Sequence, residues 1–409
     1  MRTRSTAVIL FVAIACAPAA SRLPLPASRI PPVDKITAAS PSTVGISDAL
    51  GATLDSIMAV GLKEHAAPGA TLAVGRYGRL VHLKAYGRLD TAIASSPVDV
   101  NTMYDMASLT KVIATTTAAM MLEEEGQLDL DRTVASYLPE FNAPDKAAIT
   151  MRMVMTHRGG LEAFAALYKT FKGREQYLQQ INLRPLKSVP GTEMVYSDWD
   201  MILTQLVIEK ITGIPLDKFV DEKIFRPLGM TGTMYTPDAS LKPRIAPTEI
   251  DTARGGLVWG KVHDENADAI GGVAGHAGLF STAPDLSIFA VMLLNGGEYN
   301  GVRLVKAATV ARWTAPQGRG SSRALGWDTP SQNSSAGHYF PPRSFGHTGF
   351  TGTSIWIDPT RDLFVILLTN RVDPTRNTTR VFALRRDIAD AVQQSIVGAP
   401  LIDWESRNK

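Results

Sequence analysis

The sequence predicts an α+β fold in which a central antiparallel sheet takes its strands from both ends of the chain. Two observations support this prediction. Runs of β-branched and other apolar residues occur at 70–75 and 80–86, and again from about residue 324 to residue 369. Between them, residues 105–310 show a mostly helical pattern. We therefore expect helices from both chain ends to flank the sheet, and the helical middle to be an inserted domain.

The first part of the fold is predicted as a helix followed by two strands. Ser47 is a suitable N-cap for a helix that runs to about His65 and ends before Pro68. Its apolar residues recur at helical spacing, so one face can pack on the sheet. Residues 70–75 and 80–86 then form two strands joined by a short turn.

The middle of the chain contains several bounded helical segments. Each one follows a capping residue or ends at a glycine or proline. The clearest are Met151–Met155, Trp199–Ile211, Leu216–Phe225 and 282–294.

The last part of the chain returns to strands and ends in a helix. The turn 358–362 predicts that the strands on either side of it are antiparallel neighbours. A final amphipathic helix spans about 379–396. Residues 46–104 and 311–409 would thus form one α/β sheet domain, and 105–310 a mostly helical domain. The predicted strands are Leu325–Trp327, Ser344–Thr348, Ser354–Asp358 and Leu363–Thr369.

The composition is that of a globular protein with a large core. Of 409 residues, 45% are hydrophobic and 20% are charged. The net charge is +3, and Arg2 and Arg4 contribute two of these charges. Since no block of like charge occurs elsewhere, nucleic-acid binding has no support. A single cysteine excludes an intrachain disulfide.

The N-terminus resembles an export signal. Residues 1–20 combine two arginines with the apolar run Ala7–Ala15, which is too short to span a bilayer. Cys16 follows this run in a context similar to a lipoprotein box, and ordinary cleavage near Ala19 is the alternative. Residues 21–45 are rich in Pro, Ser and Ala and are expected to form a flexible tether. We expect an exported protein that is periplasmic or anchored to the envelope, with membrane contact only through a lipid at Cys16.

Three short motifs carry the chemistry. Ser108 and Lys111 lie three residues apart, so a helix places a hydroxyl beside an amine, as an activated serine nucleophile needs. Tyr196-Ser197-Asp198 stands just before a predicted helix, and Gly346-His347-Thr348-Gly349 enters a predicted strand.

Together these motifs resemble those of the serine β-lactamase and penicillin-binding-protein superfamily, which are Ser-x-x-Lys, Tyr-x-Asn and Lys/His-Thr/Ser-Gly. The resemblance to its class C-related branch of serine hydrolases extends over about 46–396. It implies a β-lactamase/transpeptidase-like fold and a covalent acyl-enzyme, without a cofactor. The flanking stretches that share the resemblance are 127–139, 149–161, 225–229, 271–286 and 345–371.

The resemblance also implies a role for each motif residue. Ser108 would attack a carbonyl carbon, and the backbone N–H groups of Ser108 and Phe350 would form the oxyanion hole. Glycine at 349 would allow the substrate to approach the strand closely. The residues expected to contact substrate are Asp198, His347, Thr348 and Gly349.

The sequence leaves the identity of the general base open between Lys111 and Tyr196. Both side chains titrate near pH 10 when unperturbed, so neither is a base at neutral pH alone. Placed together in a partly dry pocket, each shifts the other, and their titrations are coupled.

Two positions depart from the family pattern. Asp198 stands where the family often has Asn, so an amide donor is lost and a charged partner for Lys111 is gained. His347 stands where many relatives have Lys, which weakens a fixed anchor for a β-lactam carboxylate. Both changes favour an esterase or peptidase over a dedicated β-lactamase.

The remaining histidines do not predict a metal site. His263 and His276 lie near acidic residues, but their spacing fits no zinc motif. We interpret His157 and His276 as residues that brace a helix end or a loop, and we expect no metal.

The leading hypothesis is therefore an exported serine hydrolase that acts on esters or on D-amino-acid amides derived from peptidoglycan. Its partner would be a small ester or peptide substrate. One alternative is a class C-like β-lactamase. The other is a non-catalytic or slowly deacylating module that binds cell-wall peptides or β-lactams.

Overall fold

The protein is described here from a computed structural model, which covers residues 35–401 except 93, 319–320 and 333. The expected signal segment and residues 21–34 of the expected tether lie outside the described residues. Within the described part, no helix is both long enough and apolar enough to cross a membrane.

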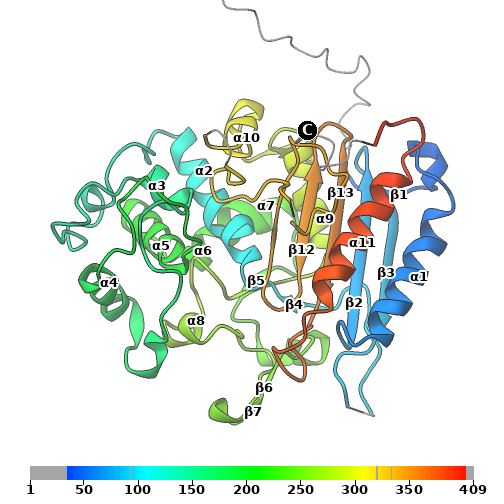
Figure 1. The fold of residues 1–409 in the computed structure, drawn as a ribbon, viewed down its shortest axis with the longest axis horizontal. Helices are drawn as coiled ribbons and strands as arrows, with labels where there is room; N and C mark the ends of the chain where they lie inside the picture. Colours follow the sequence, from blue (N-terminus) through cyan, green and yellow to red (C-terminus); the bar gives the residue numbers. More distant parts are fainter. Residues whose placement is uncertain (1–34, 93, 319–320, 333, 402–409) are drawn as a thin grey trace, which may run out of the picture. The chain divides into compact units, whose positions relative to one another are not determined.

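A six-stranded sheet forms the centre of the fold, with the order β1-β3-β2-β13-β12-β11 (Figure 1). β1 runs parallel to β3, and all other neighbours are antiparallel. β13 pairs with β2 from Leu363 opposite Arg76 to Thr369 opposite Ala70, which joins the two ends of the chain. The prediction of a central antiparallel sheet is confirmed. Its strands are β1 Thr37–Ala38, β2 Gly69–Arg76, β3 Arg79–Gly87, β11 Phe345–Thr348, β12 Ser354–Asp358 and β13 Leu363–Thr369.

Helices cover both faces of this sheet because its strand residues alternate between the faces. α1 (Leu50–Lys63) and α11 (Val381–Gln394) lie side by side on one face, where they pack on Leu72 and Val74 of β2 (Figure 1). Ala73, between those two residues, belongs instead to the core that includes α9 (Ala283–Leu294). The helices expected from both ends of the chain are therefore present on one face.

The region between β3 and β11 is mostly helical, with short sheets. The strand order β4-β8-β5 builds a three-stranded sheet, β9 pairs with β10, and β6 pairs with β7. The helices are α2 Thr117–Glu124, α3 Met151–Met155, α4 Gly173–Leu183, α5 Asp198–Thr212, α6 Leu216–Val220, α7 Arg226–Leu228, α8 Glu265–Ala269 and α10 Ala307–Trp313. The short strands are β4 Tyr104–Asp105, β5 Met234–Tyr235, β6 Ile250–Asp251, β7 Gly256–Leu257, β8 Leu279–Ser281, β9 Glu298–Tyr299 and β10 Val302–Arg303.

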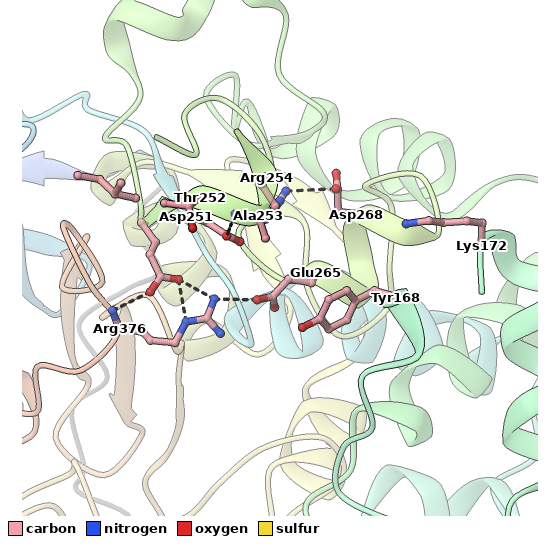
Figure 2. A pocket seen from close by; sticks show the side chains of 11 residues that line it. Tyr168, Lys172, Asp251, Thr252, Ala253, Arg254, Glu265, Asp268 and Arg376 are labelled. Carbon is pink, nitrogen blue, oxygen red and sulfur yellow. Dashed lines mark hydrogen bonds and ion pairs between the residues drawn. The ribbon is translucent and has the colours of Figure 1, made fainter. Parts of the chain in front are cut away.

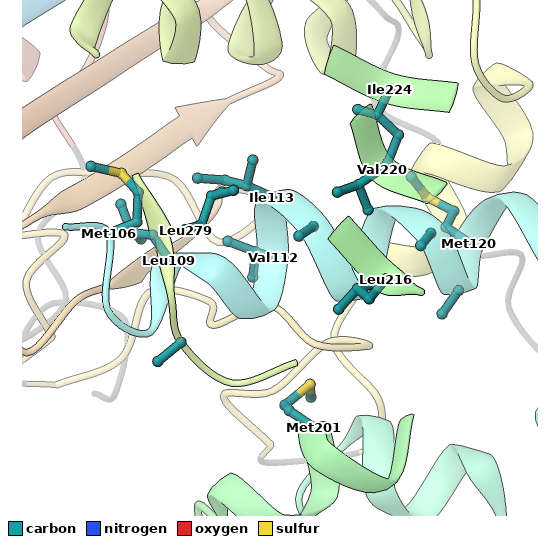
Figure 3. Close-up of a cluster of buried hydrophobic side chains, with 14 of the residues drawn as sticks. Met106, Leu109, Val112, Ile113, Met120, Met201, Leu216, Val220, Ile224 and Leu279 are labelled. Atoms are coloured by element: carbon teal, nitrogen blue, oxygen red, sulfur yellow. The ribbon is translucent and has the colours of Figure 1, made fainter. Parts of the chain in front are cut away.

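The helix that follows Ser108 runs through the core of this region. It begins with π-helical turns, η2 (Lys111–Thr116), and continues as α2. Figure 3 shows its apolar residues, such as Val112 and Met120, among side chains of the α6 segment and Met201 of α5. Burial on all sides fixes this helix, and therefore the residues at its N-terminus. One further π-helical segment is Asp221–Phe225. Short 3-10 helices occur at Pro41–Val44, Val134–Ser136, Leu167–Lys169, Ala239–Arg244 and Thr252–Arg254.

Two expectations about local structure are wrong. Leu325–Trp327 is a turn and not a strand, because Gly326 has a φ of +76° and its N–H donates to the carbonyl of Met155 at 2.7 Å. A Cβ at residue 326 would lie 2.0 Å from Oγ1 of Thr116, so only glycine fits there. The tether is expected to extend to residue 45, but Thr37 and Ala38 form β1, which pairs with β3 and belongs to the folded unit.

Candidate active site

Ser108 follows a sharp bend at the end of β4. Ala107 has a φ of +44°, which is strained for a residue with a Cβ. Buried Asp105 stabilises the bend, because one carboxylate oxygen accepts the Ala107 N–H at 2.7 Å and the other accepts the His263 N–H at 2.6 Å. The bend leaves Ser108 only partly buried, at the N-terminus of the helix.

Lys111 is fully buried, and its ammonium has three partners. Nζ donates to Oγ of Ser108 at 2.8 Å and to the carbonyl of His276 at 3.1 Å, and it lies 2.8 Å from Oδ1 of Asp198. Burial by itself lowers the pKa of Lys111, but the Asp198 carboxylate and the nearby Tyr196 raise it above its usual value overall. The amine is therefore an ammonium at neutral pH, and the pairing of Lys111 with Asp198 is the one that the sequence indicated.

Tyr196 completes the predicted group. Its ring centroid lies 5.0 Å from Nζ of Lys111, 4.7 Å from the His157 ring and 5.8 Å from the His347 ring. The buried hydroxyl makes no hydrogen bond of ordinary geometry within the described residues, yet it is close enough to Lys111 to raise the pKa of that amine. The structure thus brings the serine, the lysine and the tyrosine together.

His347 lines the site as a neutral ring. Its Nδ1 lies 2.9 Å from the carbonyl of Thr348 and so carries the proton, while buried Nε2 has no partner among the described residues. Burial, together with the charges of Arg323 and Lys111, holds the pKa of His347 well below its usual range. The sequence left both charge states open, and the structure selects the neutral one.

Arg323 supplies a cation that the sequence analysis missed. Its guanidinium carbon lies 5.1 Å from the Tyr196 ring centroid, and Nε and Nη1 are buried without a hydrogen-bond partner in the described part of the chain. Its ion-pair partner, Asp328, is 3.9 Å away. Arg323 lies outside every motif, in an irregular segment, so no sequence signal marks it.

His157 and Asp200 form a neutral pair behind Tyr196. Nδ1 of His157 lies 2.9 Å from Oδ2 of Asp200, and both side chains are buried. Burial lowers the pKa of His157 well below its usual value and raises that of Asp200 well above its own, so the pair shares one proton. His157 does brace a loop, but it also positions the ring of Tyr196.

The two predicted oxyanion donors are free. Among the described residues, the N–H groups of Ser108 and Phe350 donate no hydrogen bond. Packing of the loop gives a further reason for glycine at residue 349. A Cβ there would lie 2.1 Å from Oγ1 of Thr353 and 2.5 Å from the carbonyl of Met106, so the glycine lets this loop pack on the bend before Ser108. Thr348 ends β11 beside it, half-buried.

Asp264 is a further residue that the sequence analysis did not assign to the site. Together with Asp198 and His276 it forms a group whose polar atoms lie within 4.8 Å of one another, an arrangement that could hold a cation. The Lys111 ammonium already contacts Asp198 and the His276 backbone, so a cation is provided by the chain itself. Burial would raise the pKa of Asp264, but His276 at 2.9 Å and the Ala267 N–H hold it below the usual value.

Figure 2 shows a polar pocket of about 520 Å³, whose lining residue Arg376 lies 6.0 Å from the ring centroid of Phe350. Part of its lining is an ion-pair network in which Arg376 donates to Glu249 at 2.7 Å and to Glu265 at 2.7 Å. Burial raises the pKa of Glu249, but His263 and Arg376 lower it to about 2 overall. Glu265, in the lining of the pocket, follows Asp264 of the candidate site in the chain. Its lining residues are Tyr168, Lys172, Glu249, Ile250, Asp251, Thr252, Ala253, Arg254, Glu265, Asp268 and Arg376.

Comparison with known proteins agrees with this geometry. The sequence model of the family described as Beta-lactamase matches residues 54–390. A protein of Escherichia coli (strain K12), whose name provisionally assigns it D-alanyl-D-alanine carboxypeptidase activity, is 35% identical over 353 residues, covering 76% of this chain and 81% of its own.

Solved structures share the fold at lower identity. A class C beta-lactamase superposes with a TM-score of 0.71 at 18% identity, covering 87% of this chain and 98% of the other. EstCE1, described as a hydrolase with promiscuous acyltransferase activity, superposes with a TM-score of 0.68 at 20% identity, covering 84% of this chain and 98% of its own. These two similarities establish the fold alone.

The neutral state of buried His347 predicts a pH dependence of stability. A histidine in the unfolded chain titrates near 6.5, whereas in the folded protein the pKa is held well below that value. Below about pH 6.5 the unfolded state therefore binds the extra proton, and stability falls as the pH falls. We expect His347→Gln to reduce this slope by about 0.7 kcal/mol per pH unit at pH 6.5 and by nearly 1.4 kcal/mol per pH unit at about pH 5, measured by urea unfolding across this range. Equal slopes in both proteins would contradict a neutral His347.

Proposed function

This chain belongs to the beta-lactamase family, and we propose that it is a carboxypeptidase that removes the C-terminal D-amino acid from peptides derived from peptidoglycan. The fold and the relatives establish the broader class, a serine hydrolase of the β-lactamase and penicillin-binding-protein superfamily, as the motifs indicated. The carboxypeptidase activity is our proposal for this chain.

The proposed reaction uses Ser108 as the nucleophile. Its Oγ attacks the scissile carbonyl, and the hydroxyl proton passes to Tyr196 in its phenolate form, because Lys111 is already an ammonium and cannot accept it. Nζ of Lys111 donates to Oγ of Ser108 and lies 5.0 Å from the Tyr196 ring centroid, so the ammonium is close to both groups that exchange the proton. The N–H groups of Ser108 and Phe350 would bind the oxyanion.

The acyl-enzyme then forms and is hydrolysed by the same groups. The C–N bond breaks, Tyr196 returns the proton to the leaving amine, and the D-amino acid departs. Water then attacks the ester carbonyl and gives a proton to Tyr196. The bond between Oγ and the acyl carbon breaks, Tyr196 returns the proton to Oγ, and the acid product leaves a regenerated Ser108. The pocket beyond Glu265 offers polar and charged groups to the remainder of the peptide.

Arg323 is the single observation that carries the carboxypeptidase proposal. Nε and Nη1 of Arg323 are buried and make no hydrogen bond to the described residues, and Nε has only the Asp328 carboxylate at 3.9 Å; such donors cost free energy unless a ligand satisfies them. They lie beside the Tyr196 ring, at the site of acyl transfer. A C-terminal carboxylate is an acceptor that matches a guanidinium in charge and shape. His347 is neutral and cannot supply this charge.

A class C-like β-lactamase has weaker support. Asp198 lacks the amide donor that relatives carry at this position, and its carboxylate is engaged with Lys111. The class C structure is 18% identical and indicates fold only.

We also propose that the protein is exported, on the basis of the arginines and the apolar run in residues 1–20. A peptidoglycan-derived substrate requires access to the cell envelope, which agrees with export. Cys16 is the residue at which a lipid would attach.

The proposed activity predicts turnover that depends on Ser108. The protein is incubated with an acyl-D-alanyl-D-alanine peptide, p-nitrophenyl butyrate and nitrocefin, beside Ser108→Ala. We expect release of D-alanine, at a rate at least about 1,000-fold lower in the variant. Ester turnover without peptide turnover would indicate an esterase, and rapid nitrocefin turnover a β-lactamase. A stable serine adduct without turnover would indicate a binding module.

Arg323 is expected to recognise the substrate carboxylate. We expect Arg323→Ala to lower kcat/KM on the free peptide about 10- to 100-fold, since a charged hydrogen bond is lost. For the same peptide with a C-terminal amide, kcat/KM should fall less than about 3-fold, because the amide does not form that charged hydrogen bond in the wild-type protein. Equal losses on both peptides would show that Arg323 acts on Tyr196 instead of the carboxylate.

The export proposal predicts a processed N-terminus. Expression of the full chain in a bacterial host, followed by mass spectrometry, should show that residues before Cys16 or before about residue 20 are absent. A mass increase at Cys16 would identify the lipidated form. A chain that retains Met1 or begins at Arg2 would contradict export.

A further inference from the structure

Arg385 is a buried cation that contacts the backbone of the third motif. It projects from α11, the last helix, and Nη2 donates to the carbonyls of Gly349 and Thr353, each at 2.8 Å. It forms no ion pair with a carboxylate in the described part of the chain. Burial, with the nearby Arg371, lowers the pKa of Arg385 to about 9, so the guanidinium is charged at neutral pH.

The position of these contacts gives the arginine a specific effect. The Gly349 carbonyl and the Phe350 N–H belong to the same planar trans peptide and point in opposite directions. The Gly349 carbonyl also accepts the Gly352 N–H at 3.1 Å, so Arg385 and this turn together fix the direction of the Phe350 N–H. A cation bound to the oxygen also polarises the peptide, which strengthens its N–H as a donor.

The rest of the loop is hydrogen-bonded to the backbone bend that precedes Ser108. Oγ1 of Thr353 donates to the carbonyl of Met106 at 3.1 Å, and Oγ1 of Thr351 donates to that of Asp105 at 2.7 Å. These bonds fix where the loop lies relative to Ser108. Arg385, together with the Gly352 N–H, fixes the direction in which the Gly349–Phe350 peptide faces, and the Phe350 N–H is left without an intramolecular acceptor among the described residues.

We propose that Arg385 is a positioning residue for the oxyanion hole: by holding the Gly349 carbonyl, it aims the Phe350 N–H at the substrate oxygen. This inference rests on the proposed acyl-transfer function. Arg385 lies in no motif and touches no reacting atom, so its role is visible only from the peptide that it orients.

The chain offers a matched control in Arg76. This arginine is also buried, and Nη1 bridges two backbone carbonyls, those of Val44 and Gly45, at 2.8 and 3.0 Å. Its partners lie outside the candidate site. Arg76→Lys therefore reports the general cost of disturbing a buried arginine that binds backbone.

The test compares an acyl-D-alanyl ester with its thionoester, in which sulfur replaces the carbonyl oxygen. Sulfur accepts hydrogen bonds weakly, so the thionoester gains little from oxyanion donors. We expect Arg385→Met to lower kcat for the oxygen ester about 10- to 100-fold, with KM within about 2-fold, and to lower kcat for the thionoester less than about 3-fold. Arg385→Lys should give an intermediate loss, and it carries the test if the Met variant does not fold.

Arg76→Lys should change both esters equally, whatever its effect on thermal stability. Equal losses for the two esters in the Arg385 variants, or an effect on KM alone, would overturn the inference. A wild-type protein that turns over neither the esters nor the D-alanyl peptide would overturn the proposed function, and the inference with it. Wild-type turnover that Arg385→Met leaves unchanged would overturn the inference alone.

Discussion

The burial of the Lys111 ammonium is the constraint on which the site depends. Removing a charged amine from water costs several kcal/mol, so the fold has to supply partners that compensate for the lost hydration. They come from the start of α5, from the loop before β8 and from Ser108 itself. Segments that are distant in the sequence are therefore held at one point by a single positive charge. The contacts that stabilise the ammonium also hold the hydroxyl of Ser108 at 2.8 Å from Nζ of Lys111, where the proposed reaction needs it.

The central sheet holds the two ends of the chain together, and so holds the segments of the candidate site in place. β13 pairs with β2, so the N-terminal and C-terminal parts of the chain form one continuous surface. The loop after β11 packs on the bend that precedes Ser108 through threonine hydroxyls and a glycine. The nucleophile and the predicted oxyanion donor Phe350 thus belong to different ends of the fold but are fixed against each other. Asp105 and Arg385 stabilise the backbone on the two sides of this contact.

Local sequence patterns predicted correctly those features that are set by residues close together in the chain. Helical spacing placed Ser108 beside Lys111, and β-branched runs located β12 and β13 with their observed bounds. The pattern failed at Leu325–Trp327, because contacts with Met155 and Thr116 impose a turn that the local apolar residues do not reveal.

Arg323 and Asp264 were missed for a similar reason. Each acts through proximity in three dimensions, and neither stands at a spacing that identifies its partner. The charge of Lys111 and the neutrality of His347 likewise follow from burial, which no motif reports.

The place of α11 in the chain has a consequence for biosynthesis. Ser108 is synthesised before β11, β12 and β13, whereas α11, which carries Arg385 to the loop opposite Ser108, is synthesised after them. If Arg385 orients the Phe350 peptide as proposed, a chain synthesised only as far as β13 would carry Ser108 without its second oxyanion donor in place. Hydrolytic competence would therefore arise late, when the final helix docks, and the nascent polypeptide would be spared premature reaction with acyl compounds that it meets on the way.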